Sequence, residues 1–592
     1  MAFRSVLLAL LCALPLVAAA RGPDTDRQLD WLTPGSVPLP EGLPEDLTDT
    51  PAPAPAPALD IGVPDDVGLW GETTFRLARV ELLGATVLDE AAVEALLRGF
   101  RDRTVTMSEL QGLREALSRL YFESGYVSSG VIIPDQEIID GVVRLQAIEG
   151  TLTTIEVRTD RRLRTDYVSG RVRRRISGPL DIGALQDTLV ALQNDGRIAR
   201  VDAELAPGTR RGDSVLRLAV VETAPWSVGL SFDNHRAESI GAERGRLSLA
   251  HGNLTGRGDM LALSADLTEG SEAAALSYTL PLAPNDATLT VYGSLDDSAV
   301  LDSPFDVLDI ESRTDSYGFR LSAPLFETLR DRVALSVGFE KRTTTTRLLN
   351  SRFSLSPGAL DGESAVAAFF AGLDYVHRGE SQVLALRGTI RRGLDAFGAT
   401  DAEDDDSIDG GLLDSDGQFT SVLLQGQYVR QLSPRVRLTL RSTAQLTANP
   451  LLAPEKLSIG GANTVRGYRE NLLVRDNGVA MTAEVGHRPF PDAAARWRRD
   501  LTLVAFADYG AAWDEDDTAP GSRLRDTTRT NQILGLGLGL LWSPLEGLDL
   551  AAYAGFDVWD DFRTGEDPRA SGSNAGLQND GIHVSASWAR RF

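Results

Sequence analysis

The chain has 592 residues, a formal net charge of −25 at pH 7 and a single cysteine, Cys12. An acidic excess of this size argues against a nucleic-acid partner, because nucleic acids select basic surfaces. Beyond residue 20 no run of 18 apolar residues occurs, which excludes a membrane protein built from transmembrane helices.

The first 20 residues have the pattern of a secretory signal peptide. Arg4 precedes an apolar run over residues 6–17, and residues 18–20 are alanines that suit a cleavage site. The apolar run is too short to span a bilayer, which requires about 20 residues. We expect residues 1–20 to be removed together with the only cysteine, which leaves neither a disulfide frame nor a thiolate site.

Residues 21–72 have the composition of a linker. The stretches "PLPEGLPEDL" and "PAPAPAPALD" are acidic and rich in proline, so we expect an extended, semi-rigid segment. Within it, only "DTDRQLDWL" at 24–32 has the pattern of a short helix.

Residues 73–223 predict two copies of one small α/β unit, at 73–150 and 151–223. In the first copy, the strand-like "FRLARVELLG" precedes two amphipathic helices, "DEAAVEALLRGF" and "MSELQGLREALSRLYFESGY", and two further strands follow. Gly125 is expected to end the second helix. The second copy repeats the order β-α-α-β-β, from "LTTIEVRT" to "DSVLRLAVVET".

Residues 224–592 predict a transmembrane β-barrel of 16 antiparallel strands. We count 16 segments of about ten residues in which apolar residues alternate with small or polar ones. Connections after the even-numbered segments are mostly short, whereas those after segments 5, 7, 9, 11, 13 and 15 are long, as in outer-membrane barrels. The barrel should be closed, because an open sheet edge leaves backbone groups unsatisfied in hydrocarbon. A soluble β-rich protein is the alternative, but such proteins rarely have this loop asymmetry.

The last predicted strand ends in aromatic residues, Trp588 and Phe592. A terminal aromatic residue on an alternating strand resembles the signal that the outer-membrane barrel-assembly machinery recognises. Arg590 interrupts the apolar register of this strand. We expect that machinery as a partner during biogenesis, and outer-membrane lipid as the surroundings of the barrel.

The loop after the eleventh segment, at about 447–478, contains "GGANTVRGYRE". A solvated loop gains little from Arg466, but in a loop folded into the lumen this arginine would be desolvated and would need a carboxylate. Asp508 on the thirteenth segment is a candidate, because it shares one strand face with Phe506 and Gly510. The alternative is that Asp508 only lines a wet lumen.

The chain resembles the transporters of two-partner secretion (TpsB-type), the haemolysin-activator and haemagglutinin-exporter family, over about residues 73–592. Val465, Arg466, Gly467 and Tyr468 match the V-R-G-[YF] motif of the loop after strand 11. Phe506, Asp508 and Gly510 match the inner-wall F-x-D-x-G motif on strand 13. Residues 125–150 are similar to the family's first POTRA domain, at Gly125, Tyr126, Pro134, Gln136, Gly141 and Gly150.

This resemblance implies two periplasmic POTRA domains followed by a 16-strand barrel in the bacterial outer membrane. It implies that the protein recognises a large unfolded exoprotein, expected to be β-helical, through its POTRA domains and secretes it through the pore. Family members often begin with a helix that plugs the pore, and here only 24–32 could supply it. A barrel-assembly or insertion factor of the same superfamily is the alternative, and a passive porin, which needs no POTRA domains, is a third class.

Two charged stretches have less specific interpretations. Eight arginines flank the start of the second α/β unit, namely Arg158, Arg161, Arg162, Arg164, Arg171, Arg173, Arg174 and Arg175. They could steer an acidic client or meet lipid headgroups, but we favour a solvated helix face. The acidic segment 395–417 could bind a divalent cation, but a solvated extracellular loop is the more common explanation. We find no catalytic, cofactor or metal-binding motif, and expect no enzyme.

Overall fold

The computed structural model describes residues 74–282, 286–301, 305–356, 358–401, 415–515, 530–561, 577–578 and 581–592. The predicted signal peptide, the linker and the short helix at 24–32 lie outside these residues, as does most of the acidic segment 395–417. Among the described residues, no helix combines the length and apolarity needed to cross a bilayer.

The first α/β unit contains five strands and two helices. In chain order they are β1 (Thr74–Leu77), β2 (Arg79–Leu83), α3 (Glu90–Arg98), β3 (Arg103–Thr106), α4 (Met107–Glu123), β4 (Gly130–Ile132) and β5 (Val142–Ile148). The helix α4 begins with a capping box between Thr106 and Glu109. It packs Leu110, Leu113, Leu117 and Tyr121 into the core of the unit.

The structure has one strand break and one extra strand that the sequence pattern did not predict. "FRLARVELLG" forms two strands instead of one. In a continuous strand, residues three apart point to opposite faces, yet Leu77 and Val80 are both buried in the core of the unit. At the break, the N–H of Ala78 donates to the carbonyl of Gly141 at 2.8 Å. Strand β1 then pairs with β3, while β2 pairs in parallel with β5.

The second α/β unit has the predicted order of elements. They are β6 (Thr151–Thr159), α5 (Thr165–Arg175), α6 (Ile182–Gln193), β7 (Ile198–Pro207) and β8 (Asp213–Glu222). The strands are ordered β6-β8-β7, with β6 parallel to β8, as expected when helices connect the first strand to the last pair. Its core includes Val168, Val172, Leu185, Leu189 and Leu216, all with 0 % exposure.

The third region is a closed antiparallel barrel whose wall has 16 strands among the described residues, which confirms the predicted fold class. These strands are β9 (Trp226–Asp233), β10 (Arg244–Gly252), β11 (Met260–Leu267), β12 (Ser271–Leu282), β13 (Ala287–Ala299), β14 (Glu311–Glu327), β15 (Asp331–Leu348), β17 (Glu363–Arg378), β18 (Gln382–Gly393), β19 (Thr420–Ser433), β20 (Val436–Thr447), β23 (Asn477–His487), β24 (Leu501–Trp513), β25 (Asn531–Leu545), β26 (Leu548–Asp560) and β27 (Ile582–Arg591). A two-residue strand, β16 (Ser351–Arg352), extends the connection after β15. The last strand closes the barrel by pairing with β9.

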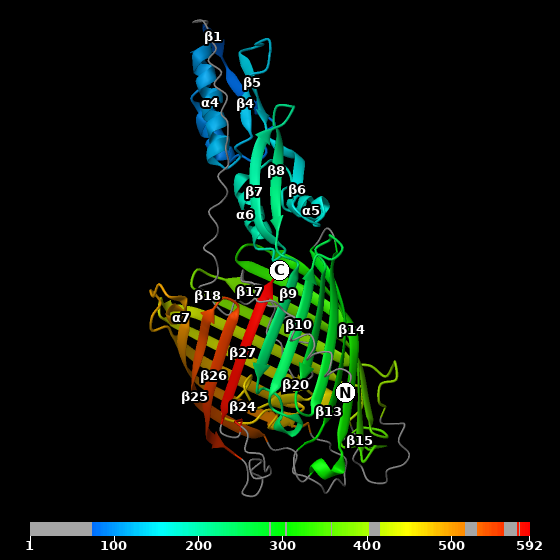
Figure 1. Ribbon diagram of the computed structural model, residues 1–592. Coiled ribbons are helices and arrows are strands. Elements are labelled where there is room, and N and C mark those ends of the chain that lie inside the picture. Colours follow the sequence, from blue (N-terminus) through cyan, green and yellow to red (C-terminus); the bar gives the residue numbers. More distant parts are fainter. Residues whose placement is uncertain are drawn as a thin grey trace.

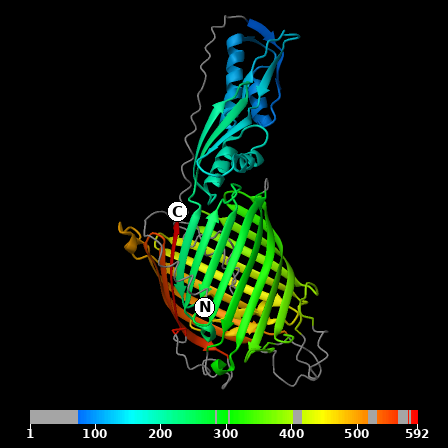
Figure 2. The same cartoon turned by 45° about the vertical axis from the view of Figure 1, so that its right-hand side comes forward.

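The two α/β units lie at one rim of the barrel, which is also where the chain ends (Figures 1 and 2). The 3-10 turns η2 (Glu238–Ile240) and η3 (Phe305–Leu308) lie in connections at the opposite rim, as strand direction requires. The longest connection at the rim near the α/β units contains a short helix, α7 (Arg496–Arg499).

The arginines of α5 dock the second α/β unit onto the barrel. Arg171 and Arg174 both form ion pairs with Asp286, in the turn between β12 and β13, and Arg171 does so at 2.8 Å. Arg175 pairs with Glu327 at the end of β14, also at 2.8 Å. The favoured interpretation of this cluster as a solvated helix face is therefore wrong for these three residues. Sequence spacing showed their shared helix, but not the barrel turns that lie against it.

Other members of the cluster also lie near this joint. The side chain of Arg162 donates to the carbonyl of Leu254, and the backbone N–H of Arg164 donates to the carbonyl of Gly256, both in the turn between β10 and β11. A Cβ at Gly258 would lie 2.4 Å from the ring of Tyr167, so the turn approaches α5 as closely as a glycine permits. The second unit therefore contacts the β10–β11 turn, the β12–β13 turn and the end of β14.

Candidate functional site: a hairpin held inside the barrel

The connection between β20 and β23 folds back inside the barrel as a hairpin. Its stem is the two-stranded pair β21 (Leu457–Ile459) and β22 (Leu473–Arg475), preceded by the 3-10 turn η5 (Ala453–Glu455). Leu457, Ile459 and Leu473 are buried against the wall residues Ala480, Ala512 and Ile533. Apolar packing therefore holds the stem, and residues 460–472 form the tip.

Arg466 at the tip is clasped by two carboxylates of neighbouring wall strands. Its Nε and Nη2 donate to the two oxygens of Asp508 on β24 at 2.7 and 3.0 Å, and its Nη1 donates to Glu484 on β23 at 3.0 Å. The backbone N–H of Arg466 also donates to Asp508, at 3.1 Å. The three residues are at most 5 % exposed. The structure thus brings Arg466 and Asp508 together in the fork geometry that arginine permits.

Two aromatic rings complete the environment of the guanidinium group. Its central carbon lies 3.5 Å from the ring centroid of Phe506 and 4.8 Å from that of Tyr553 on β26. Such contacts are strongest when the cation is desolvated, as it is here. Two negative charges and two aromatic faces therefore surround one cation.

Glycines in the wall create the space for the backbone of the tip. A Cβ at Gly535 would lie 2.1 Å from the carbonyl oxygen of Arg466, and one at Gly555 would lie 2.4 Å from the backbone nitrogen of Gly467. A Cβ at Gly510 would lie 2.9 Å from the side chain of Val465. Gly535 opens the run "GLGLGLL", and the structure shows that its missing side chain admits the hairpin.

The other residues of the V-R-G-Y stretch have separate structural roles. Val465 is completely buried in the stem cluster. Gly467 has φ +101°, a conformation that residues with side chains rarely adopt. Tyr468 donates its hydroxyl to the carbonyl of Trp559 on β26 at 2.9 Å. The tip is therefore attached to β23, β24 and β26 at once.

The base of the hairpin is attached to the opposite side of the wall. The carboxylate of Glu455 pairs with Arg391 on β18 at 3.0 Å, and Arg391 also lies 3.6 Å from Glu340 on β15. Arg342 on β15 pairs with Glu340 at 2.8 Å and donates to the carbonyl of Pro454 at 2.7 Å. In strand count β15 is the seventh and β26 the fifteenth of 16, so the contacts of the hairpin extend around about half of the wall, to two nearly opposite strands.

A further ion cluster joins the two legs of the stem. Lys456 pairs with Asp476 at 2.8 Å and with Asp514 at 2.9 Å, and Arg475 pairs with Asp514 at 3.3 Å. Asp476 is 1 % exposed and also accepts from the backbone N–H of Leu451. These bonds fix the point at which the hairpin leaves and rejoins the wall.

Glu470 in the tip is a half-buried acid. The pKa of its carboxyl group is raised to about 7, mainly by burial and to a smaller extent by the charge of Asp233. The N–H of Ala462, at 2.7 Å, and the charge of Arg244 oppose this shift. Near neutral pH the carboxyl group therefore titrates while the hairpin is docked.

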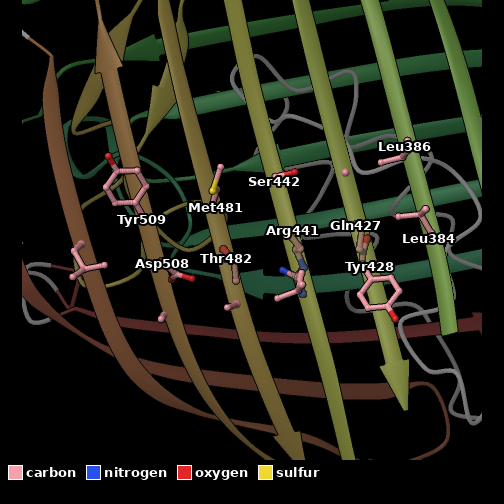
Figure 3. A pocket seen from close by; sticks show the side chains of 15 residues that line it. Leu384, Leu386, Gln427, Tyr428, Arg441, Ser442, Met481, Thr482, Asp508 and Tyr509 are labelled. Atoms are coloured by element: carbon pink, nitrogen blue, oxygen red, sulfur yellow. The ribbon is translucent and has the colours of Figure 1, made fainter. Parts of the chain in front are cut away.

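The wall behind the clasp contains a hollow of about 460 Å³ lined by residues of β18 to β25. Neighbouring residues along β24, Asp508 and Tyr509, leave the strand on opposite sides (Figure 3). The outward lining includes Leu386 and Met481, which are 44 % and 51 % exposed. Small residues such as Gly426 line the hollow between these larger outward side chains. We therefore interpret the hollow as a depression in the lipid-facing surface of the wall.

The residues predicted for the first α/β unit form its turns and its joint to the second unit. Gly125 has φ +90° after α4, and its carbonyl accepts from Ile182 of the second unit at 3.0 Å. The carbonyl of Gly150 accepts from Leu180, also in the second unit, at 2.7 Å. Gly125 and Gly150 of the first-unit motif therefore join the two α/β units, and these contacts do not involve the hairpin.

The remaining residues of this motif support local structure. The ring of Tyr126 packs edge-on against Tyr121 with centroids 6.5 Å apart. The side chain of Gln136 exchanges hydrogen bonds with the backbone of Arg144 on β5, at 2.7 and 2.8 Å, and also contacts the carbonyl of Pro134. Gly141 has φ +70° where it meets Ala78.

The C-terminal aromatic residues lie on the strand that closes the barrel. Trp588 is paired with Leu548 of β26 and with Leu230 of β9. Phe592 and Trp226 exchange backbone hydrogen bonds at 2.9 and 3.2 Å, and Phe592 remains 46 % exposed. Recognition of this end by the assembly machinery stays a prediction.

Glu484, Tyr553 and the pair Glu455–Arg391 belong to the site but were not predicted from the sequence. A weak signal existed for Glu484, which lies on the inward phase of "VAMTAEVGHRPF" in the strand beside Asp508. No local pattern indicates Glu455, because its partner lies 64 residues away along the chain.

A closed barrel of 16 strands, α/β units at one rim and a hairpin clasped in the lumen define a POTRA-bearing β-barrel of the bacterial outer membrane. The sequence model of the family described as haemolysin secretion/activation protein ShlB/FhaC/HecB matches residues 212–541, and that of the ShlB-type POTRA domain matches residues 75–150. The first of these matches covers more than half of the chain, so the chain belongs to this family.

Individual relatives agree with this assignment. The chain is 24 % identical to the outer membrane transporter CdiB of Dickeya dadantii over 76 % of its length and 78 % of that protein. It is 25 % identical to the hemolysin transporter protein ShlB of Serratia marcescens, over 68 % of this chain and 70 % of that protein. The solved structure of CdiB from Escherichia coli has the same fold, with a TM-score of 0.62, 20 % identity and coverage of 89 % and 93 %.

The protein is thus an outer-membrane translocator of two-partner secretion, with its POTRA region in the periplasm. Transporters of this family work with large secreted partner proteins, and they are not enzymes.

Proposed function

We propose that this protein captures one large, unfolded exoprotein through its POTRA units and passes it through the barrel when the lumenal hairpin moves. In this proposal the second α/β unit, residues 151–223, is a second POTRA domain, and the cargo is β-helical. The cargo crosses as an extended chain, and its folding outside the cell makes the transfer directional.

The docked hairpin is the observation that carries the proposal. It lies inside the bore, and its attachments to the wall are ion pairs, hydrogen bonds and small apolar contacts that can be exchanged for others. The clasp at Arg466 is the ion-paired attachment with both partners most deeply buried, which makes it the best candidate for holding the resting position. We therefore assign Val465, Arg466, Gly467, Tyr468, Phe506, Asp508 and Gly510 to this gate.

Capture of the cargo is assigned to the free sheet edges of the α/β units. In the first unit β2 and β4 are edge strands, and in the second β6 and β7 are. An extended chain with β propensity can add to such an edge through main-chain hydrogen bonds. The names of the relatives refer to different cargoes, haemolysin in one case and heme/hemopexin in another, so they do not identify the cargo of this chain.

Two parts of the proposal concern biogenesis and rival functions. We propose that outer-membrane lipid surrounds the barrel and that the assembly machinery recognises its last strand through Trp588 and Phe592. A role as an assembly or insertion factor is not favoured, because the chain belongs to the secretion family. The BamA structure of Haemophilus ducreyi shares the fold at a TM-score of 0.50 and 14 % identity.

A deletion strain tests the proposal directly. We expect one very large protein to disappear from the extracellular proteome and to return with the wild-type gene. The Arg466→Ala variant should insert normally but fail to restore that protein. If the extracellular proteome is unchanged and other outer-membrane barrels are depleted, the assembly function replaces this proposal.

A further inference from the structure

The segment after β18, residues 394–400, lies against the outer face of the barrel wall. Along β17, residues in phase with Phe369, which is 49 % exposed, point outward. Ala365 and Ala367 share this phase, yet they are only 3 % and 0 % exposed. The N–H groups of Leu394 and Thr400 donate to the carbonyls of Ala367 and Ala365 at 2.8 and 2.9 Å. The segment therefore adds to the edge of β17 and covers this part of the wall.

The segment lies at the outer edge of the apolar band of the barrel. The outward residues of β15 are apolar from Val333 to Phe339 and become polar from Lys341 toward the extracellular end. Phe339 is paired with Phe319 of β14 and with Phe369 of β17, so three phenylalanines lie side by side at this level. This arrangement resembles the aromatic girdle with which outer-membrane barrels mark the membrane interface.

Phe397 adds a fourth ring to this row from outside the wall. Its ring centroid lies 5.1 Å from that of Phe339, its carbonyl accepts from Lys341, and its side chain is 64 % exposed. Its φ is +57°, a left-handed conformation that is unfavourable for a bulky residue. Strain of this kind persists where surrounding structure or function requires it.

We propose that residues 394–400 form an outer-leaflet lipid-binding surface, with Phe397 among acyl chains just below the headgroups. Aromatic rings are favoured at this level, where one side is apolar and the other is hydrated. The ammonium group of Lys341 stands at the same height and suits an anionic headgroup. The segment thereby fixes this side of the barrel at a defined depth, independently of the function proposed for the hairpin.

Site-directed spin labelling tests the proposal in the full chain. The only cysteine is Cys12, within the predicted signal peptide, so one introduced cysteine reports alone. The labelled variant Phe397→Cys, reconstituted in outer-membrane lipid, is compared with Phe369→Cys on the wall and Val307→Cys in η3, where Val307 is 74 % exposed. We expect the ratio of oxygen to nickel-chelate collisions at position 397 to be close to that at 369 and about tenfold above that at 307, since oxygen partitions into apolar surroundings.

A second measurement uses the unaltered chain. Phospholipid with a diazirine near the carbonyl end of its acyl chain is photolysed in the reconstituted membrane, and labelled peptides are identified by mass spectrometry. We expect labelling within residues 394–400. Nickel contact at position 397 equal to that at 307, together with no photolabel in this segment, would overturn the proposal. Dipolar broadening between labels at position 397 would also overturn it, because it would show that a second copy of the chain covers the surface.

Discussion

Removing the side chain of Arg466 should release the hairpin from the wall without opening the barrel. The Arg466→Ala variant leaves Asp508, which is 0 % exposed, and Glu484, which is 5 % exposed, without their cation. Breaking a buried ion pair by removing one partner costs about 3–5 kcal/mol. At about 1.4 kcal/mol per factor of ten, the docked state should lose roughly two to four orders of magnitude in its equilibrium constant.

Hydrogen exchange in the reconstituted protein measures this change. The amides of residues 460–472 should exchange faster by about the same factor, because they exchange from the released state. The amides of β24 should keep their protection, since the wall strands retain their own hydrogen bonds. The secretion assay should show loss of export at an unchanged level of inserted barrel.

Arg469 supplies the matched control within the same tip. It lies three residues along the hairpin, and among the described residues no ion pair involves it. Arg469 is half-buried and Arg469→Ala breaks no ion pair among the described residues, so exchange of the tip should stay within about twofold of the wild type, a change of about 0.5 kcal/mol. Unaltered exchange in Arg466→Ala, or equal acceleration in both variants, would refute the reasoning.

A charge swap tests direct pairing of Arg466 and Asp508. We expect the double variant Arg466→Asp with Asp508→Arg to secrete more than either single reversal. Recovery should be partial, because the swapped acid would face Phe506 and Tyr553 in place of the cation that these rings stabilise. Absence of any recovery would count against a direct functional contact.

Three more predictions concern the hairpin. Glu455→Gln should loosen the base of the hairpin while leaving the Arg466 clasp intact, so amide hydrogen exchange should accelerate at residues 453–456 and only weakly at the tip. Equal acceleration at both ends would show instead that the hairpin docks as one unit. The docking of the wild-type hairpin should weaken as pH rises from about 4.5, the pKa of a free glutamate, toward about 7, because the raised pKa of Glu470 favours its protonated form. The free energy of docking should fall by at most about 1.4 kcal/mol per pH unit. Glu470→Gln should flatten this pH dependence, and a slope that persists in the variant would exclude Glu470 as its source. Gly535→Val should displace the tip, because a Cβ would lie 2.1 Å from the carbonyl of Arg466, and unchanged protection of the tip in this variant would contradict the packing.

The sequence predicted the barrel well because each of its strands carries its own signal. Alternation within about ten residues, together with alternating short and long connections, defines strand number and direction without any knowledge of long-range contacts. The pairing of Arg466 with Asp508 was one of two interpretations that the sequence offered, because a desolvated loop arginine requires a carboxylate, whereas Asp508 could also have lined a wet lumen.

The sequence could not show contacts that depend on where distant segments meet. Arg171 and Asp286 lie on different units, and their pairing depends on how the second unit is seated on the barrel. Glu455 and Arg391 come together only because the hairpin folds back into the lumen. The break at Ala78 depends on the carbonyl of Gly141, which no local pattern of the first strand reveals.

The docked hairpin does not divide the bore evenly, because its base, stem and tip contact successive wall strands from β18 to β26. The opposite part of the wall comprises β27 and the strands from β9 to β14. The second α/β unit is seated only over the latter side, at the β10–β11 turn, Asp286 and Glu327. A polypeptide that enters the bore from that unit would therefore pass along β27 and the strands from β9 to β14, on the side of the wall away from the hairpin.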